Sequence, residues 1–255
     1  MQLDNIKAEY DKDGHFKVTS FFSREEINQI AYDLEQFKDG IRYLDDSSIL
    51  RRLEKMVYQI PSLKKANEKI VTLLNKIMQE DMILFKDKYN VKPPKGEGFY
   101  AHYDGIFIWN DEKGIKQKGW HKYATEFFNV LIAIDKCDEG NGTLEVSNEI
   151  HSSMTFEQML DQTYKNGTPQ LKQEVEDDIT FYKVDLNPGD IVFFSNRCPH
   201  RSEKNNSETR TRRILYFTYN KLKDGDNYNQ YFSDKASSNK NSFVSKALSV
   251  RKEKV

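Results

Sequence analysis

The sequence predicts a mainly β domain, a jelly roll or β-sandwich with helices at its N-terminal side. In the first third of the chain apolar residues recur at helical spacing. From residue 98 onward, short runs rich in aromatic and β-branched residues replace that pattern. Turn clusters at 138–142 and 187–190 separate these runs. Helices followed by many short strands are typical of a closed or double-layered sheet with a helical buttress.

The N-terminal part is predicted to contain a strand and two helices. Residues 16–22 are apolar and β-prone. Ser23 and Glu26 then have the spacing of a capping box, in which each side chain accepts a hydrogen bond from the other's backbone amide, so a helix should begin here. A second helix is expected over residues 63–87. Its apolar face consists of Ile70, Leu73, Leu74, Ile77, Leu84 and Phe85.

The C-terminal part is predicted to be built from short strands. Residues 155–181 are polar, with a helical stretch at 156–160, and are expected to form an insertion that acts as a lid over the barrel mouth. One domain is expected over residues 1–233, followed by a basic tail at 234–255 that is either loosely ordered or a packing arm. The predicted strands lie within 98–109, 126–134, 142–147, 190–195 and 212–220.

Two histidines and one carboxylate form a candidate metal site. Side chains two residues apart on a strand point to the same face, so His102 and Asp104 can reach one ion, and Gly105 allows the chain to turn beside it. His200 follows a predicted buried strand and supplies a third ligand. This ligand set is that of mononuclear non-haem iron(II) centres, which keep coordination positions open. Zinc accepts the same donors, so a non-catalytic metal-binding jelly roll stays an alternative.

A cluster of arginines follows the second histidine. Arg212 and Arg213 begin a predicted strand, so one of them should face the interior and the other the outside. A buried arginine needs an anion, and a carboxylate fits its planar fork. Ser202 is placed to donate its hydroxyl to the same anion. Arg210 and Arg213 remain alternatives to Arg212.

The composition narrows the classes of binding partner and the cellular location that we expect. The 255 residues include 39 basic and 40 acidic side chains, a net charge of −1, so no overall field favours nucleic acid or a membrane as partner. The sequence shows neither a long apolar run nor a charged-then-apolar N-terminus, so no membrane span or signal peptide is expected. Cys137 and Cys198 are isolated, which favours a reducing, cytoplasmic location. The expected partner is a small molecule; the oligomeric state is left open.

These residues belong to a longer pattern that resembles the phytanoyl-CoA dioxygenase (PhyH) family of Fe(II)/2-oxoglutarate oxygenases. The resemblance covers roughly residues 8–222. It implies a double-stranded β-helix, the cupin-like form of the jelly roll, with Fe(II), 2-oxoglutarate and O₂ as the cofactor and cosubstrates. The segments that carry it are 10–16, 21–27, His102-Tyr103-Asp104, 141–146, 188–190, His200-Arg201-Ser202 and the strand from Arg212.

The resemblance also implies roles for individual residues. His102, Asp104 and His200 would bind the iron, and Ser202 with Arg212 would hold the far carboxylate of 2-oxoglutarate. Arg212 lies one residue further from His200 than in the family, which is why Arg213 and Arg210 stay open. Further positions similar to family residues are Phe99 and Asn90 for the cosubstrate pocket and Trp120 for the active site.

The substrate is predicted only by class. Trp109, Trp120 and His121 precede a predicted strand and are expected to line the mouth of the site. Surplus arginines favour a small anionic or zwitterionic substrate, such as an amino acid, a phosphonate or a carboxylate. An acyl-CoA is the alternative that the resemblance leaves open. Asp104 disfavours a halogenase, whose chloride takes the place of that carboxylate, and residues 210–213 lack the R-x-N-x-T-x-R pattern of nucleic-acid oxygenases.

Overall fold

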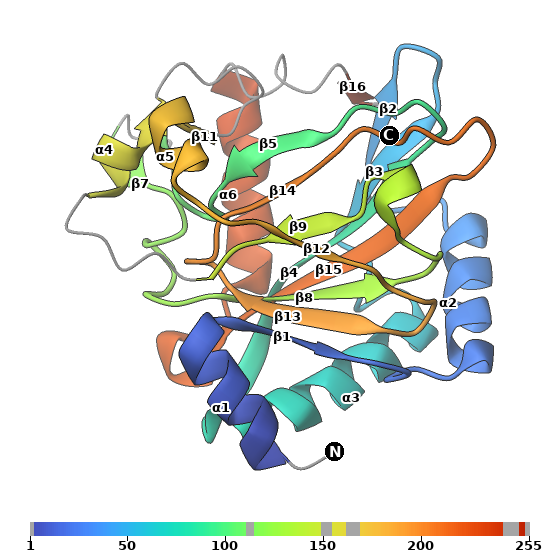
Figure 1. The fold of residues 1–255 in the computed structure, drawn as a ribbon, viewed down its shortest axis with the longest axis horizontal. Coiled ribbons are helices and arrows are strands. Elements are labelled where there is room, and N and C mark those ends of the chain that lie inside the picture. The colour runs from blue at the N-terminus through green and yellow to red at the C-terminus, as the bar shows by residue number, and fades with distance from the viewer. Residues whose placement is uncertain (1–2, 111–114, 149–154, 162–168, 242–249, 253–255) are drawn as a thin grey trace.

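Two antiparallel sheets packed face to face form most of the molecule (Figure 1). The computed structural model describes residues 3–110, 115–148, 155–161, 169–241 and 250–252. Buried apolar side chains from both sheets meet between them, among them Leu131 and Phe194 from the larger sheet and Leu144 and Val146 from the smaller one. The predicted jelly roll is therefore confirmed.

The larger sheet has eight strands in the order β1-β13-β8-β15-β4-β3-β2-β16, and the smaller has four in the order β12-β9-β14-β5. Two short pairs, β6 with β7 and β10 with β11, complete the strands. The bounds of the larger sheet are β1 His15–Val18, β2 Ile41–Asp45, β3 Leu50–Glu54, β4 Met82–Lys92, β8 Phe128–Ala133, β13 Ile191–Ser195, β15 Arg212–Lys221 and β16 Val250–Lys252. The others are β5 Phe99–His102, β6 Ile108–Asn110, β7 Lys116–Lys118, β9 Leu144–Val146, β10 Leu160–Asp161, β11 Gln170–Leu171, β12 Tyr182–Val184 and β14 His200–Ser202.

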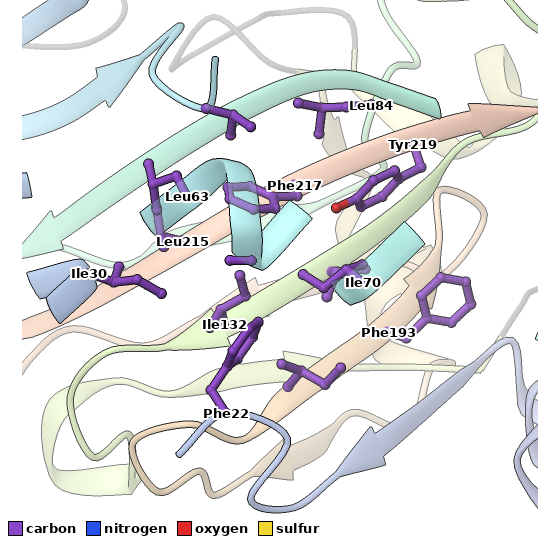
Figure 2. Close-up of a cluster of buried hydrophobic side chains, with 14 of the residues drawn as sticks. Phe22, Ile30, Leu63, Ile70, Leu84, Ile132, Phe193, Leu215, Phe217 and Tyr219 are labelled. Carbon is purple, nitrogen blue, oxygen red and sulfur yellow. The ribbon is translucent and has the colours of Figure 1, made fainter. Parts of the chain in front are cut away.

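N-terminal helices cover the outer face of the larger sheet. Ile30 of α2 and Ile70 of α3 pack in one cluster with Leu215 and Phe217 of β15 (Figure 2). Ile70 is fully buried, and removing such a side chain from water stabilises the fold by about 1.5–3 kcal/mol. The helices are α1 Leu3–Asp13, α2 Arg24–Gln36, α3 Pro61–Met78, α4 Phe156–Met159, α5 Gln173–Asp177 and α6 Tyr228–Asn241. Among the described residues, no helix has the length and apolar character that a membrane span requires.

The capping box predicted at the start of the first amphipathic helix is confirmed. The Glu26 amide donates to Ser23 Oγ at 3.2 Å, and the Ser23 amide donates to Glu26 Oε2 at 2.7 Å. These two bonds satisfy amides that the first turn of α2 leaves without intrahelical partners. They fix the point at which the chain leaves β1 and enters α2.

The helix predicted over residues 63–87 is wrong in its second part. α3 ends at Met78, where Gln79 adopts a left-handed conformation with φ of +53°, and β4 begins at Met82. β4 pairs with β15 on one side and β3 on the other. These ladder hydrogen bonds, which come from distant segments, override the helical spacing of Leu84 and Phe85. β2 and β3 also lie outside the predicted elements.

The described part of the 155–181 insertion packs against the strand that carries His102. Met159, Leu160, Leu171 and Val175 form a cluster with Tyr103 and Ala101 of that segment. Side chains alternate along a strand, so this cluster lies on the face of β5 opposite to His102. The insertion therefore supports the metal-site strand from behind, and residues 162–168 of the predicted lid lie outside the described residues.

The segment predicted as a tail begins inside α6. That helix runs across residue 233, and Phe232 is buried in the main core. Beyond residue 233, the Asp234 carboxylate accepts hydrogen bonds from Lys122 Nζ at 2.6 Å and Tyr123 Oη at 2.7 Å. Lys235 forms an ion pair with Glu54. These first residues of the segment thus belong to the packed domain.

Asp87 ties β4 to two other parts of the fold. Its buried carboxylate accepts backbone amides of Lys55, Met56 and Val57 at 2.6–2.8 Å, and the hydroxyl of Tyr228 in α6 at 3.1 Å. Substitution Asp87→Ala leaves three amides without an acceptor. We expect it to lower the free energy of unfolding by about 3 kcal/mol in urea denaturation. The exposed Asp11→Ala should show no measurable change, and a loss under about 1 kcal/mol for Asp87→Ala would contradict the assignment.

Candidate metal centre and cosubstrate pocket

The smaller sheet brings the two predicted histidines side by side. His102 is the last residue of β5 and His200 the first of β14, and the two are direct partners in the antiparallel register. Their ring centroids are 4.3 Å apart. Asp104 follows in the turn, with Oδ2 at 3.8 Å from His200 Nε2. One ligand atom from each of the three residues lies within 4.8 Å of the others, so they can converge on one ion.

The hydrogen bonds of the histidines leave the correct nitrogen available. His102 Nδ1 lies 2.7 Å from the Tyr100 carbonyl oxygen, and His200 Nδ1 lies 3.3 Å from that of Cys198. A carbonyl oxygen only accepts, so each Nδ1 carries the proton and donates. Each Nε2 then presents a lone pair to a metal, the arrangement by which hydrogen bonds to neighbouring carbonyls orient metal-binding histidines.

The charges of the three side chains suit a dication. Burial lowers the pKa of His200 to about 3 and also lowers the pKa of His102. Burial alone would raise the pKa of Asp104, but nearby basic groups, Lys86 foremost, outweigh it and hold the pKa well below its usual range. At neutral pH the cluster therefore contains two neutral imidazoles and one carboxylate. These are the protonation states in which the groups bind metal.

Gly105 and Trp120 shape the turn beside the centre. Gly105 has a φ of +78°, and a Cβ there would lie 2.5 Å from the Trp120 ring. The Trp120 amide donates to the Gly105 carbonyl at 2.9 Å. The indole is buried and packs on Phe85 and Phe127, at centroid distances of 5.4 and 5.2 Å, so it cannot easily yield. Only glycine fits this close approach.

A second buried cluster lies where β4 ends and β15 begins. Arg212 and Lys92 are direct cross-strand partners, and both are about 2% exposed. Arg212 Nη1 donates to the Gly142 carbonyl at 2.5 Å, while its buried Nε has no acceptor among the described residues. Lys92 Nζ donates to Ser202 Oγ at 2.9 Å and to the carbonyls of Gly142 and Glu203.

Neither of these cations has a carboxylate partner among the described residues. Burial, and next the charge of Arg212, lower the pKa of Lys92 to about 6, and burial lowers the pKa of Arg212. A protonated Lys92 and Arg212 without counter-ions are costly in a folded protein, and a bound anion removes that cost. The group formed by Lys92, Ser202 and Arg212 therefore suits an anionic ligand, and we call it the cosubstrate pocket after the role proposed for it below. Lys92 is absent from the residues predicted for this pocket.

The alternatives to Arg212 have their charges balanced elsewhere. Arg210 donates two hydrogen bonds to Asp138, at 2.7 and 2.8 Å, on the surface. Arg213 faces the outside, as expected of one member of the pair, and binds Asp135 and Glu35 at 2.8–2.9 Å. The geometry thus favours Arg212 for an incoming carboxylate.

The remaining predicted residues differ in how close they lie to the site. Asn90 is buried on the same face of β4 as Lys92, and its Oδ1 accepts from Arg52 Nε at 3.3 Å. Phe99 is 39% exposed, and its ring centroid lies 6.0 Å from Lys92 Nζ, at the rim of the cosubstrate pocket.

The mouth-lining role of two other residues, His121 and Trp109, stays a prediction. His121 is exposed in the turn after Trp120. Trp109 belongs to β6 by its backbone, and its side chain lies outside the described part of the chain.

The metal triad has two further cations beside it that the predicted residues do not include. Lys86 and Lys88 lie on the same face of β4 as Asn90 and Lys92, and both act electrostatically on Asp104. Burial lowers the pKa of Lys86 well below its ordinary value and that of Lys88 to about 8. We call Lys86, Lys88, Asn90 and Lys92 the β4 stripe. Their alternation in the sequence is the signal by which a strand could have been recognised.

A jelly roll that presents two histidines and a carboxylate in this way defines the class of mononuclear non-haem iron proteins. The family model of phytanoyl-CoA dioxygenase (PhyH) matches residues 10–214 of this chain. The chain therefore belongs to the PhyH family, which confirms the resemblance drawn from the sequence.

Two curated relatives extend this comparison. The chain is 27% identical over 243 residues to a 2-aminoethylphosphonate dioxygenase from an uncultured bacterium, covering 90% of the chain and 86% of that protein. It is 33% identical over 167 residues to a methylphosphonate hydroxylase of Gimesia maris, and this match covers 66% of the chain and 56% of the hydroxylase.

Solved structures agree with the fold. EctD from S. alaskensis, solved with 2-oxoglutarate and 5-hydroxyectoine, superposes with a TM-score of 0.67 at 15% identity, over 88% of this chain and 77% of EctD. The epimerase SnoN, which is described as non-haem and alpha-ketoglutarate dependent, gives a TM-score of 0.65 at 14% identity, over 86% and 81%. At these identities the likeness concerns the fold alone.

The close approach at Gly105 can be tested by substitution. Gly105→Ala forces a Cβ into the Trp120 ring and displaces the turn that holds Asp104. We expect Co(II) binding, followed by its visible absorption, to weaken by at least about 10-fold. Gly225→Ala is the matched control, because Gly225 also has positive φ, +104°, but its Cβ would meet only the Asn227 side chain, at 3.4 Å or more. Equal Co(II) affinity in the two variants would contradict the proposed role of the turn.

Proposed function

We propose that the protein is an Fe(II)- and 2-oxoglutarate-dependent dioxygenase that hydroxylates a small organophosphonate. The observation that carries the oxygenase class is the pair of buried basic side chains without carboxylate partners, Lys92 and Arg212, beside a His-Asp-His centre. A jelly-roll protein that only binds a metal would not require the buried basic side chains of the cosubstrate pocket. The phosphonate is supported by the names of the two relatives, which favour it over the alternative of an acyl-CoA.

The metal ligands follow from the donor set. His102 and His200 would bind iron through Nε2 and Asp104 through its carboxylate, which leaves the other coordination positions free. Bound Fe(II) supplies the activation of O₂ that is coupled to oxidative decarboxylation of 2-oxoglutarate. The chain's own part is to keep the three ligands oriented. The Tyr100 and Cys198 carbonyls do so by holding each Nδ1 proton.

The cosubstrate pocket would orient 2-oxoglutarate. Arg212 offers its unpartnered Nε and the rest of its planar fork to the far carboxylate. Ser202 accepts from Lys92, so its own hydroxyl proton is free to be donated to the same carboxylate. The burial of Lys92, Arg212 and Ser202 limits access of water and strengthens each of these interactions. The keto acid end is then directed toward the triad.

Turnover is the direct test. The protein with Fe(II), ascorbate, 2-oxoglutarate and O₂ should release succinate when methylphosphonate or 2-aminoethylphosphonate is added, and ³¹P NMR should show a hydroxylated product. His200→Ala should reduce both signals to background, because it removes one of three metal ligands. Failure of every small phosphonate to stimulate succinate release from the wild-type protein would refute the proposal.

The cosubstrate pocket can be tested separately by anaerobic titration of 2-oxoglutarate into the Fe(II) protein, followed by the visible charge-transfer band. Arg212→Met should raise the Kd for 2-oxoglutarate by about 100-fold, since it removes a buried charged partner of the carboxylate. Arg210→Met is the control, because that guanidinium is already bound to Asp138 on the surface, and its Kd should stay unchanged. A larger effect from Arg210→Met than from Arg212→Met would reverse the assignment.

A further inference from the structure

Two cations of the β4 stripe lack a partner that would explain their burial. Lys86 is 9% exposed, and its Nζ lies 3.7 Å from the centroid of the Trp120 ring. Lys88 is partly buried, and its Nζ lies 4.5 Å from the Tyr216 ring. Aromatic faces attract a cation only modestly. Among the described residues, neither ammonium group donates a hydrogen bond or pairs with a carboxylate.

The nearby carboxylates are engaged elsewhere. Glu54 lies directly across from Lys88 on β3, but it pairs with Lys235 and accepts from Tyr43 Oη at 3.3 Å. Asp104 is the other acid that acts on both lysines, and it belongs to the proposed metal triad. A bound dication therefore leaves the positive charge of the two lysines uncompensated.

The cosubstrate cannot neutralise them either. Lys92 lies six residues from Lys86 and four from Lys88 on one strand, which corresponds to about 20 Å and about 13 Å. Both separations exceed the length of a five-carbon diacid held by Arg212 and Lys92. The stripe therefore carries two separate cationic groups, one at the Lys92 end and one at the Lys86 end.

Two buried donors at the Lys86 end also lack acceptors among the described residues. Trp120 Nε1 belongs to the ring under Lys86. Asn129 Nδ2 is held in place because Asn129 Oδ1 accepts from Thr218 Oγ1 at 2.8 Å. Thr218 is the cross-strand partner of both Asn129 and Lys86, so these three side chains are neighbours on one face of the sheet.

The structure assigns the phosphonate group of the substrate to this end of the stripe; we infer that Lys86 and Lys88 bind it, with the Trp120 and Asn129 donors. This inference rests on the proposed function. A phosphonate has three oxygens that accept hydrogen bonds in several directions, which matches donors that come from β4, from β8 and from the turn at Trp120. Lysine is a suitable point-charge partner for it. Lys86 lies over the Trp120 ring, and Trp120 packs on Gly105, the residue after Asp104, so a phosphonate held there lies beside the metal triad.

The same arrangement limits substrate size. The Trp120 ring is backed by Phe85 and Phe127, so a buried aromatic wall closes this end of the site. A substrate whose anionic group must reach Lys86 can extend only toward the metal. This favours phosphonates with one or two carbons.

The test measures two properties of the variant Lys86→Met: its affinity for methylphosphonate and its stability in urea. We expect Lys86→Met to raise the Kd for methylphosphonate by at least about 30-fold, measured by calorimetry on protein loaded with Co(II) and 2-oxoglutarate without O₂. The Kd for 2-oxoglutarate should stay within about threefold of wild type. The urea midpoint of the ligand-free protein should be equal or higher, because a methionine of similar shape replaces an unpaired buried cation. A lysine with only a structural role would give a lower midpoint and an unchanged Kd.

Lys88→Met provides a second variant should Lys86→Met fail to fold, with the same expectation. Lys223→Met is the control, because that exposed lysine pairs with Glu80 far from the stripe, and its Kd values should equal those of wild type.

The inference is overturned if the Kd for methylphosphonate is unchanged in the lysine variants, or if the Kd for 2-oxoglutarate rises equally. It is also overturned if the wild-type protein binds neither methylphosphonate nor 2-aminoethylphosphonate. If wild type hydroxylates a phosphonate while the lysine variants keep its affinity, only this inference fails. If wild type binds methylphosphonate through the lysines but releases no succinate, only the proposed function fails.

Discussion

The pairing of β4 with β15 is the constraint on which both the core and the site depend. Its register sets Lys92 opposite Arg212 and Lys86 opposite Thr218, all facing the smaller sheet. The alternate residues Leu215 and Phe217 face the helices and fill the main core (Figure 2). A slip by one residue would turn the apolar side chains toward the metal centre and the cations toward the helices. The hydrophobic outer face therefore specifies the position of every cation on the inner face.

This arrangement explains how the fold tolerates several buried cations. Unpaired charges on the inner face of β4 destabilise the ligand-free protein. The outer face of the same strands contributes the largest apolar cluster, and Asp87 adds hydrogen bonds to the turn before α3 and to α6. Anions that bind the native state alone then stabilise it in proportion to their affinity. The unpaired charges of the site therefore lower the stability of the ligand-free protein, and the surrounding apolar packing offsets this loss.

The sequence predicts the parts of this protein that depend on local pattern. The capping box at Ser23, the strand run at 212–220 and the alternation of His102 with Asp104 are each visible within a few residues. The lysines of β4 also alternate, but the helical spacing of apolar residues in α3 continues through Leu84 and obscures that signal. Only pairing with β3 and β15, which are distant in sequence, makes this segment a strand. The choice among the three arginines likewise depends on their acid partners, which no local pattern gives.

The two ends of the β4 stripe differ in the anion geometry that they suit. At one end Arg212 presents a planar fork whose hydrogen bonds match a carboxylate. At the other end the donors are two ammonium groups from β4, an amide from β8 and an indole from the turn at Trp120. This spread of directions matches a tetrahedral group better than a planar one. A protein that binds two small anions next to one metal must keep each out of the other's place. Under the proposed assignment, donor geometry accomplishes this, since each ligand in the wrong place would leave buried donors without acceptors.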